Sequence, residues 1–208
     1  MSCELFERYS ELKVCESDIE EALEMMIMTY RSGGKILVCG NGGSSADADH
    51  IVGELMKGFM LKRRMNESTE KKLRETLGDN AQRYVERLQC AIPAISLSAQ
   101  SAVLSAYAND VDAELVYAQL VFGYARDEDM LIAISTSGNS KNVLAAAEVA
   151  KALGIKTLAL TGYLGGVLSQ ICDCTIRVPE TETYKIQELH LPVYHYLCAE
   201  TERALFNK

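Results

Sequence analysis

The sequence has no apolar run near the ~20 residues that a membrane span needs, and residues 1–11 are too polar for a signal peptide. We therefore expect neither a membrane partner nor a secretory leader. Acidic residues outnumber basic ones by 29 to 21, a net charge of −8. This excess argues against nucleic acid or an anionic membrane as the main partner. An acidic protein can still bind phosphate through backbone N–H groups and helix N-termini.

Cysteine pairing is also missing from the sequence. The seven cysteines form no C-x-x-C motif, and their odd number does not suit a disulfide framework. Cys172 and Cys174 are too closely spaced for a usual zinc knuckle. We expect reduced thiols, mostly packed as small hydrophobic side chains, in a cytoplasmic protein.

Short apolar runs alternate with helical patterns along the chain. With 208 residues and no internal repeat, the sequence predicts a single domain over residues 1–208. The alternation predicts an α/β fold in which a five-stranded parallel sheet is flanked by helices on both faces. Ligands of such sheets bind beyond the C-terminal ends of the strands. The five expected strands are residues 35–39, 93–97, 130–134, 156–160 and 174–178.

Three further segments surround this core. Apolar residues at helical spacing predict an N-terminal helix over residues 3–31. A last helix is expected over residues 184–206, with a kink or interruption at Pro192. Residues 62–89 are rich in charge and predict one or two solvated amphipathic helices, with a basic binding patch as the alternative.

The strongest local motif follows the third expected strand. Residues 135–140 read Ser-Thr-Ser-Gly-Asn-Ser and lie between a strand and a helix start. Small residues allow an anion to approach the backbone, and the helix N-terminus supplies free N–H donors. Capping of the helix would need only one such residue, so four hydroxyl groups favour phosphate binding. The loop lacks lysine and the G-x-x-x-x-G-K-[ST] pattern, which argues against nucleotide hydrolysis.

A second glycine-rich loop follows the first expected strand. Residues 40–45 read Gly-Asn-Gly-Gly-Ser-Ser and lack the third glycine of a dinucleotide-binding turn. We therefore favour a sugar or phosphate contact here over a nicotinamide cofactor.

Histidine is scarce, and all three histidines lie on helices near these loops. His50 and Glu54 share a helix face at the i, i+4 spacing. Gln187 and His195 share a side of the last helix, because eight residues correspond to about 80° around the axis. Either group could be structural. Together they could also build a metal site of imidazole and carboxylate ligands.

In combination these motifs resemble the SIS-domain (sugar isomerase) family, and among its members the phosphoheptose isomerases. The resemblance covers nearly the whole chain. Six motifs occur in the family's order: residues 39–44, 48–50 with Glu54, 108–110, 134–140, 160–162, and 186–190 with His195.

The resemblance implies a flavodoxin-like three-layer sandwich that assembles as a homotetramer with active sites between subunits. It implies conversion of sedoheptulose 7-phosphate to D-glycero-D-manno-heptose 7-phosphate through an enediol(ate), with Glu54 and His195 as acid/base groups. The zinc of some members, one per subunit, would be held by His50, Glu54, Gln187 and His195. The implied substrate-binding residues are Asn41, Gly42, Gly43, Ser44, Asp110, Ser135, Thr136, Ser137, Ser140 and Gln187.

The sequence departs from the family in two places. Lys57-Gly58-Phe59 stands where Gly-Arg-Phe or Gly-Arg-Tyr is usual, so Lys57 or Lys62 replaces the arginine contact or the contact is absent. The charged segment 62–89 is longer than in the best-known members. Two alternatives stay open: a non-enzymatic SIS module that binds sugar phosphates or a replication initiator, and an isomerase or lyase of another phosphosugar.

Overall fold

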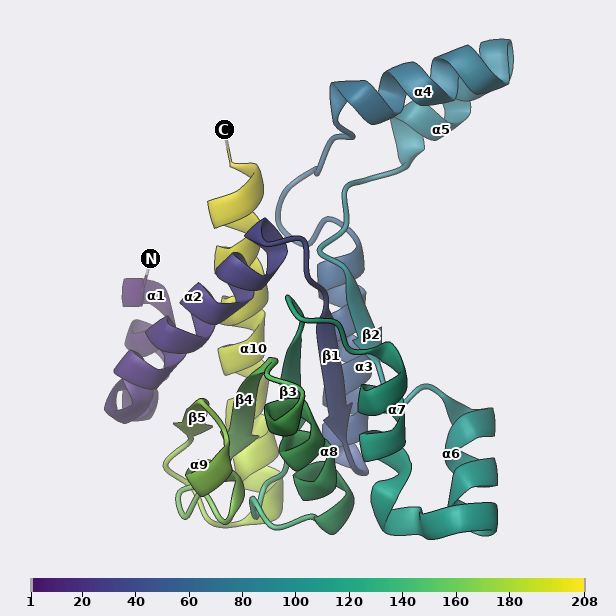
Figure 1. Ribbon diagram of the computed structural model, residues 1–208. Helices are drawn as coiled ribbons and strands as arrows, with labels where there is room; N and C mark the ends of the chain where they lie inside the picture. Colours follow the sequence, from purple (N-terminus) through teal and green to yellow (C-terminus); the bar gives the residue numbers. More distant parts are fainter. Residues whose placement is uncertain (1, 208) are drawn as a thin grey trace.

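A five-stranded parallel sheet forms the centre of the molecule (Figure 1). The computed structural model describes residues 2–207. The strands lie in the order β2-β1-β3-β4-β5, every neighbouring pair is parallel, and helices cover both faces. The α/β fold predicted from the sequence is therefore confirmed. The strands are β1 Ile36–Gly40, β2 Ala94–Ser96, β3 Met130–Ile134, β4 Lys156–Thr161 and β5 Cys174–Arg177.

Alternating residues of each strand supply two separate cores. In β1, Ile36 and Val38 pack into one core, whereas Leu37 and Cys39 pack into the other. The first core lies against α2 (Glu16–Arg31), α3 (Gly43–Met56) and α10 (Thr183–Phe206). The second lies against α7 (Val116–Tyr124) and α8 (Lys141–Ala152). The layers are therefore helix, sheet and helix.

Strands β1 and β3 are neighbours, yet the chain leaves them in opposite directions. It passes from β1 into α3 on one face and from β3 into α8 on the other. Such a reversal opens a crevice at the C-terminal strand ends, where α/β proteins of this kind bind ligands. Both glycine- and serine-rich loops begin at this point.

The N-terminal segment differs from the single helix expected over residues 3–31. The structure has α1 (Ser2–Arg8), a 3₁₀ helix η1 (Ser10–Cys15) and then α2. The break falls at Tyr9, whose φ of −133° and ψ of 69° are not helical. Leu12 and Ile19 are nevertheless fully buried. The apolar spacing therefore predicted correctly that these residues are buried. In the structure they are buried by α1, η1 and α2 and not by one continuous helix.

The last helix is continuous, so of the kink or interruption expected at Pro192, the interruption does not occur. Helix α10 runs from Thr183 to Phe206 with Pro192 inside. Pro192 is buried, as are His190 and Val193 on either side. A proline removes one intrahelical hydrogen bond, and the packing of the flanking residues keeps the helix continuous despite this loss.

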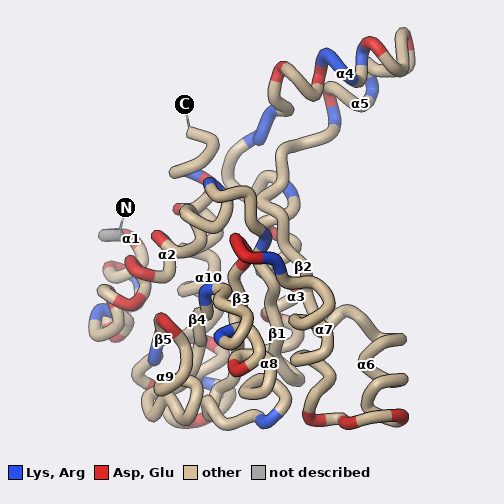
Figure 2. The backbone as a smooth tube through the Cα atoms, in the orientation of Figure 1, with Lys and Arg blue, Asp and Glu red and all other residues tan. Residues whose placement is uncertain are grey.

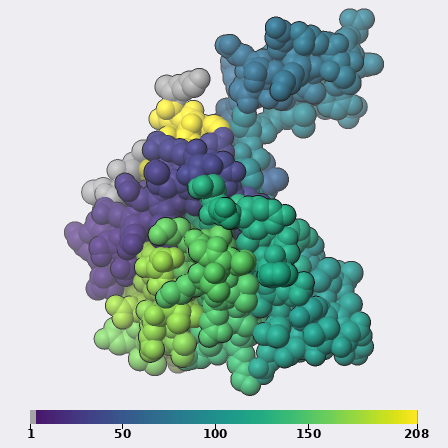
Figure 3. Space-filling model, in the orientation of Figure 1, coloured from purple at the N-terminus to yellow at the C-terminus, as the bar shows by residue number. Residues whose placement is uncertain are grey.

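Residues 66–88 form an arm that projects from the body (Figures 1 and 3). Helix α4 (Glu67–Leu77), a short 3₁₀ turn η2 (Gly78–Asn80) and α5 (Ala81–Arg87) make a hairpin. Ala81 is its only fully buried residue, and Leu77 and Tyr84 are exposed. Figure 2 shows that the arm carries charges of both signs, whereas acidic residues prevail on α1 and α2.

The remaining helices are short. A segment beside α7 contains α6 (Ser101–Tyr107), a π-helical turn η3 (Ala108–Asp112) and a 3₁₀ turn η4 (Ala113–Leu115). Helix α9 (Leu168–Ile171) precedes β5. Within residues 2–207, no helix is both long and apolar enough to cross a membrane.

The cysteines that the structure describes are free thiols. Burial, aided by neighbouring acidic groups, raises the pKa of Cys15 to about 11 and that of Cys198 to about 12. These side chains therefore stay protonated and pack as small hydrophobic groups.

Candidate active site

Two helix N-termini meet at the crevice between β1 and β3. The cap residues are Gly42 for α3 and Ser140 for α8, and neither makes a side-chain capping hydrogen bond. Asn41 and Asn142 hold the two helix starts together. The Asn41 amide donates to Asn142 Oδ1 at 2.8 Å, and the Asn142 amide donates back to Asn41 Oδ1 at 2.9 Å. Ser44 and Ser45 already donate their N–H groups to the Asn41 and Gly42 carbonyls, and Val143 donates its own to Asn142 Oδ1, so the first-turn N–H groups left for an anion are those of Gly43, Lys141 and Asn142.

The serine loop lies over the start of α8. Ser135 Oγ and Ser140 Oγ are 2.9 Å apart, which brings hydroxyls from the two ends of the loop together. Ser137 Oγ accepts the Asn139 N–H at 3.1 Å, and the Thr136 carbonyl accepts the Gly162 N–H at 3.0 Å. Ser140 therefore uses its hydroxyl within the loop and not as a cap, so simple helix capping does not account for the loop; we call residues 135–140 and the two helix starts the candidate anion cradle.

Gly138 lets this loop fold tightly against a neighbouring one. Its φ is +66°, and a Cβ placed there would lie 1.9 Å from the Gly165 carbonyl oxygen. The Leu168 N–H donates to the Gly138 carbonyl at 3.1 Å, which ties the two loops together. Any larger residue at position 138 would have to displace the backbone.

Gly43 plays a comparable role beside α10. A Cβ at this position would lie 2.5 Å from Gln187 Nε2. The missing side chain therefore makes room for the Gln187 amide at the first turn of α3, next to the buried Ser44. This contact carries the last helix to the edge of the anion cradle.

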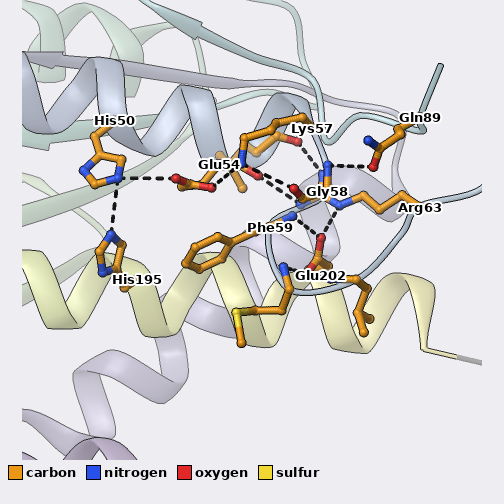
Figure 4. Close-up of polar contacts among 12 residues, drawn as sticks. His50, Glu54, Lys57, Gly58, Phe59, Arg63, Gln89, His195 and Glu202 are labelled. Carbon is orange, nitrogen blue, oxygen red and sulfur yellow. Dashed lines mark hydrogen bonds and ion pairs between the residues drawn. The ribbon is translucent and has the colours of Figure 1, made fainter. Parts of the chain in front are cut away.

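Further along α3 and α10, the side chains of His50, Glu54 and His195 lie close together (Figure 4). His50 Nε2 lies 3.3 Å from Glu54 Oε1 and 3.4 Å from His195 Nε2. The imidazoles of His50 and His195 meet edge to face, with centroids 4.9 Å apart. The sequence placed His50 and Glu54 on one helix face and His195 on another helix, and the structure brings all three together.

Tyr194 and Asp47 determine which nitrogen of His50 carries its proton. The Tyr194 hydroxyl donates to Asp47 Oδ1 at 3.2 Å and lies 3.0 Å from His50 Nδ1. Since that hydroxyl proton points to Asp47, the Tyr194 oxygen accepts the His50 Nδ1–H. Neutral His50 therefore presents a bare Nε2 to Glu54 and His195. The sequence analysis missed this pair, although Asp47 precedes His50 by three residues and so shares its helix face.

The surroundings favour a neutral imidazole at His195 and place a cation beside Glu54. Burial, and next the nearby His50, lower the pKa of His195 below its ordinary value. Lys57 Nζ donates to Glu54 Oε2 at 2.8 Å, so a cation stands beside the carboxylate even though the usual arginine is absent. The Phe59 ring packs near His195 with centroids 5.6 Å apart and covers one side of the cluster.

We tested whether the expected zinc ligands suit a metal ion. Within residues 2–207, no set of three or more His, Cys, Asp or Glu side chains is arranged so that it could hold a metal ion. The two spacings from His50 Nε2, 3.3 and 3.4 Å, nevertheless equal the ~3.3 Å between two ligands of tetrahedral zinc. A bare Nε2 that faces a carboxylate oxygen also requires a proton or a cation between them. Each of these two spacings suits a pair of zinc ligands, but the described side chains do not form a complete metal site as they stand, and the Gln187 amide lies beside Gly43.

Asp110 and His190 lie outside this cluster. Asp110 is on the exposed η3 turn, which connects α6 to η4 and α7, and its carboxylate accepts the Asn109 amide. His190 is fully buried and its Nε2 lies 3.2 Å from the Thr161 carbonyl. Burial lowers its pKa to about 4, so His190 is a neutral structural residue.

Comparison with known proteins gives a consistent picture. Two family models described as SIS domain match residues 94–197 and residues 4–90. The phosphoheptose isomerase of Helicobacter pylori (strain P12) is 39% identical over 197 residues, which cover 95% of this chain and 89% of that protein. The phosphoheptose isomerase of Rhodospirillum rubrum is 37% identical over 191 residues, or 92% and 88% of the two chains. A solved phosphoheptose isomerase from Francisella tularensis superposes with a TM-score of 0.77 at 30% identity, and the match covers 94% of this chain and 91% of that one.

Proposed function

The chain belongs to the SIS-domain family and is closely related to the phosphoheptose isomerases, and we propose on this premise that it interconverts sedoheptulose 7-phosphate and D-glycero-D-manno-heptose 7-phosphate. Phosphoheptose isomerases are aldose–ketose isomerases, which move a carbonyl between C1 and C2 without net oxidation. The observation that carries the proposal is the cluster of Glu54, His50 and His195 beside an anion cradle.

The dimensions of α3 suit a long sugar phosphate. We place the phosphate at residues 135–140 and at the first turns of α3 and α8, with Asn41, Gly42 and Ser44 beside it. His50 lies seven residues beyond Gly43, or ~10 Å along the helix. A seven-carbon chain that is held by its phosphate can bring its first two carbons to the cluster.

The cluster supplies the groups that the reaction needs. Glu54 takes a proton from C1 of the ketose and leaves an enediolate, and return of a proton to C2 gives the aldose. His195 moves the proton between the two oxygens, for which a neutral imidazole is suited. Its lowered pKa maintains that neutral state at pH 7. Lys57 forms an ion pair with Glu54 and so helps to hold its carboxylate in place.

We also assign one zinc ion per subunit to His50, Glu54, Gln187 and His195; a Glu54 carboxylate bound to zinc cannot freely act as the base, so these two roles of Glu54 are alternatives. When bound, the ion would polarise the sugar oxygens and stabilise negative charge on them. The chain's own contribution is orientation, because Tyr194 and Asp47 fix the His50 tautomer with Nε2 free.

A homotetramer would explain two features of the surface. Val111 and Phe122 are apolar yet about two-thirds exposed, near one edge of the body. Asp110 lies on the same edge, away from the cluster, so we propose that it enters the site of a neighbouring subunit. We further propose that the protein self-associates, binds the phosphorylated sugar and is located in the cytoplasm. Nucleic acid and membranes are not expected as partners.

The direct test is incubation with sedoheptulose 7-phosphate after chelation, with and without added zinc, followed by separation of the sugar phosphates. We expect aldose to accumulate with wild-type protein and with the exposed-carboxylate control Glu148→Gln, but not with Glu54→Gln. Tight sugar-phosphate binding without turnover by wild type would instead indicate a non-enzymatic module. Turnover of a different phosphosugar alone would change the substrate but not the reaction class.

A further inference from the structure

A buried ion pair lies behind the acid–base cluster. Arg63 and Glu202 are both fully buried, and Arg63 Nε donates to Glu202 Oε1 at 2.6 Å (Figure 4). Taking two charges out of water is costly, and the cost is recovered only where geometry is good and the remaining hydrogen-bonding capacity is used. The partners of this pair therefore indicate what it is built to hold.

Glu202 holds a loop. Its Oε1 accepts the Phe59 N–H at 2.8 Å, and its Oε2 accepts the N–H groups of Met60 at 2.6 Å and Leu61 at 2.8 Å. Burial alone would raise the pKa of Glu202, but these backbone donors and the Arg63 guanidinium outweigh burial and lower it. One carboxylate thus accepts four hydrogen bonds, two on each oxygen, and remains ionised.

Arg63 holds the end of a helix. Its Nη1 donates to the Leu55 carbonyl at 2.5 Å, and its Nη2 donates to the Glu54 carbonyl at 3.0 Å. Both carbonyls belong to the last turn of α3, where backbone acceptors lack intrahelical partners. A positive charge is also favoured at this end of the helix dipole. The guanidinium therefore fixes the backbone of Glu54 itself.

Arg63 and Glu202 together contact α3, α10 and the loop at Phe59, which carry or cover the cluster. Glu202 lies seven residues after His195 on α10, so the two side chains share a helix face two turns apart. Phe59, held by Glu202 through its N–H, packs its ring near His195. On the basis of the proposed function, we propose that Arg63 and Glu202 are positioning residues that set the distance between Glu54 and His195 during isomerisation.

The molecule contains a matched control for this proposal. Asp129 is also buried, forms an ion pair with Lys35, and accepts the N–H groups of Lys35 at 2.8 Å and Arg126 at 2.7 Å. Asp129 and Lys35 directly precede β3 and β1, and the hydrogen bonds of Asp129 go to Lys35 and Arg126, not to α3, α10 or the loop at Phe59. Loss of Asp129 should disturb the fold comparably without touching the site.

The first test compares Glu202→Gln with Asp129→Asn. An amide presents NH₂ where the second carboxylate oxygen was, so two of the four donors lose their acceptor. A misplacement of about 1 Å can cost ~10²-fold in rate, so we expect kcat to fall by roughly that factor. KM should stay within about twofold, since the phosphate loop is untouched and only transition-state alignment is lost. Asp129→Asn should keep the wild-type kcat at equal folded fraction.

A second pair of variants separates positioning from stability. Arg63→Lys keeps the charge but cannot reproduce three contacts of a planar guanidinium, so kcat should fall here too. Replacing a buried ion pair by apolar residues is often neutral for stability, which makes Arg63→Met combined with Glu202→Leu informative. We expect a low kcat even where its Tm approaches that of wild type. Recovery of kcat together with Tm would overturn the proposal.

Histidine NMR provides a readout that needs no turnover. In ¹H–¹⁵N spectra of the three imidazoles, Glu202→Gln should shift the His195 ring signals, whereas Asp129→Asn should leave them unchanged. Unchanged His195 signals in Glu202→Gln, or equal kcat losses in the two variants, would refute the positioning role. If wild type shows no isomerase activity, the proposed function fails while the spectra still decide whether the pair positions His195.

Discussion

Gly138 provides a sharp test of the phosphate loop, because the chain contains a glycine that serves as its control. Gly138 and Gly154 have similar backbone angles, with φ of +66° and +77°. A Cβ at position 154 would meet nothing within 4 Å, whereas a Cβ at position 138 would lie 1.9 Å from the Gly165 carbonyl oxygen. Alanine at either position suffers the left-handed backbone, but only Gly138→Ala also collides with the neighbouring loop.

The two effects can be separated in magnitude. A left-handed conformation costs a non-glycine residue about 1–2 kcal/mol, so Gly154→Ala should lose about that much stability. Overpacking adds typically 1–3 kcal/mol, so Gly138→Ala should lose about 2–5 kcal/mol. For a chain of this size each kcal/mol lowers Tm by roughly 2–4 °C. The gap between the two melting temperatures therefore measures the cost of the collision.

Calorimetric binding of inorganic phosphate completes the experiment. Displacement of the Gly138 backbone moves Ser137 and Ser140, so we expect Gly138→Ala to bind phosphate at least about tenfold more weakly, or ~1.4 kcal/mol. Gly154→Ala, at the far end of α8, should bind like wild type. Equal phosphate affinities in the two folded variants would show that the anion binds elsewhere.

Three further outcomes are expected. Burial lowers the pKa of His190 from 6.5 to about 4, so its contribution to the free energy of unfolding is fully present above pH 6.5. As the pH falls from 6.5 to 4, about 3 kcal/mol of this contribution is lost. Denaturant titrations at several pH values should therefore show a smaller loss of stability at acid pH for His190→Gln than for wild type. Tyr194→Phe removes the acceptor of His50 Nδ1–H and should weaken zinc binding about 10–100-fold in competition with a chelating dye, and unchanged affinity would argue against His50 as a ligand. Amides of α4 and α5 should exchange with deuterium orders of magnitude faster than those of α3, because short helices with little buried surface are marginal, and equal protection would mean that the arm is covered in the assembly.

The sheet was predictable because its strands are buried on both faces. Continuous apolar runs such as residues 36–39 and 130–134 leave few other interpretations, and the glycines between the runs mark the turns. The helices were less predictable at their breaks. Neither the turn at Tyr9 nor the continuity through Pro192 is encoded locally, because packing between α1, α2 and α10 decides both.

The site residues also differ in how well the sequence predicts them. His50 and Glu54 were predictable because helical spacing determines their common face. Their meeting with His195 rests on family resemblance, since no local pattern relates residues 145 positions apart. Arg63 and Glu202 escaped notice because a charged residue in a charged segment suggests solvent exposure, and only the fold shows that both are buried.

The central claim is that Glu54 removes a proton from carbon, and isotope incorporation tests it most directly. Sedoheptulose 7-phosphate is incubated in D₂O with wild type, with Glu54→Gln and with Glu148→Gln, and deuterium at C2 of the aldose is measured by NMR. We predict deuterium at C2 with wild type and with Glu148→Gln, and turnover at least ~10²-fold slower with Glu54→Gln. Aldose that keeps only protium at C2, or Glu54→Gln that turns over like wild type, would contradict the account.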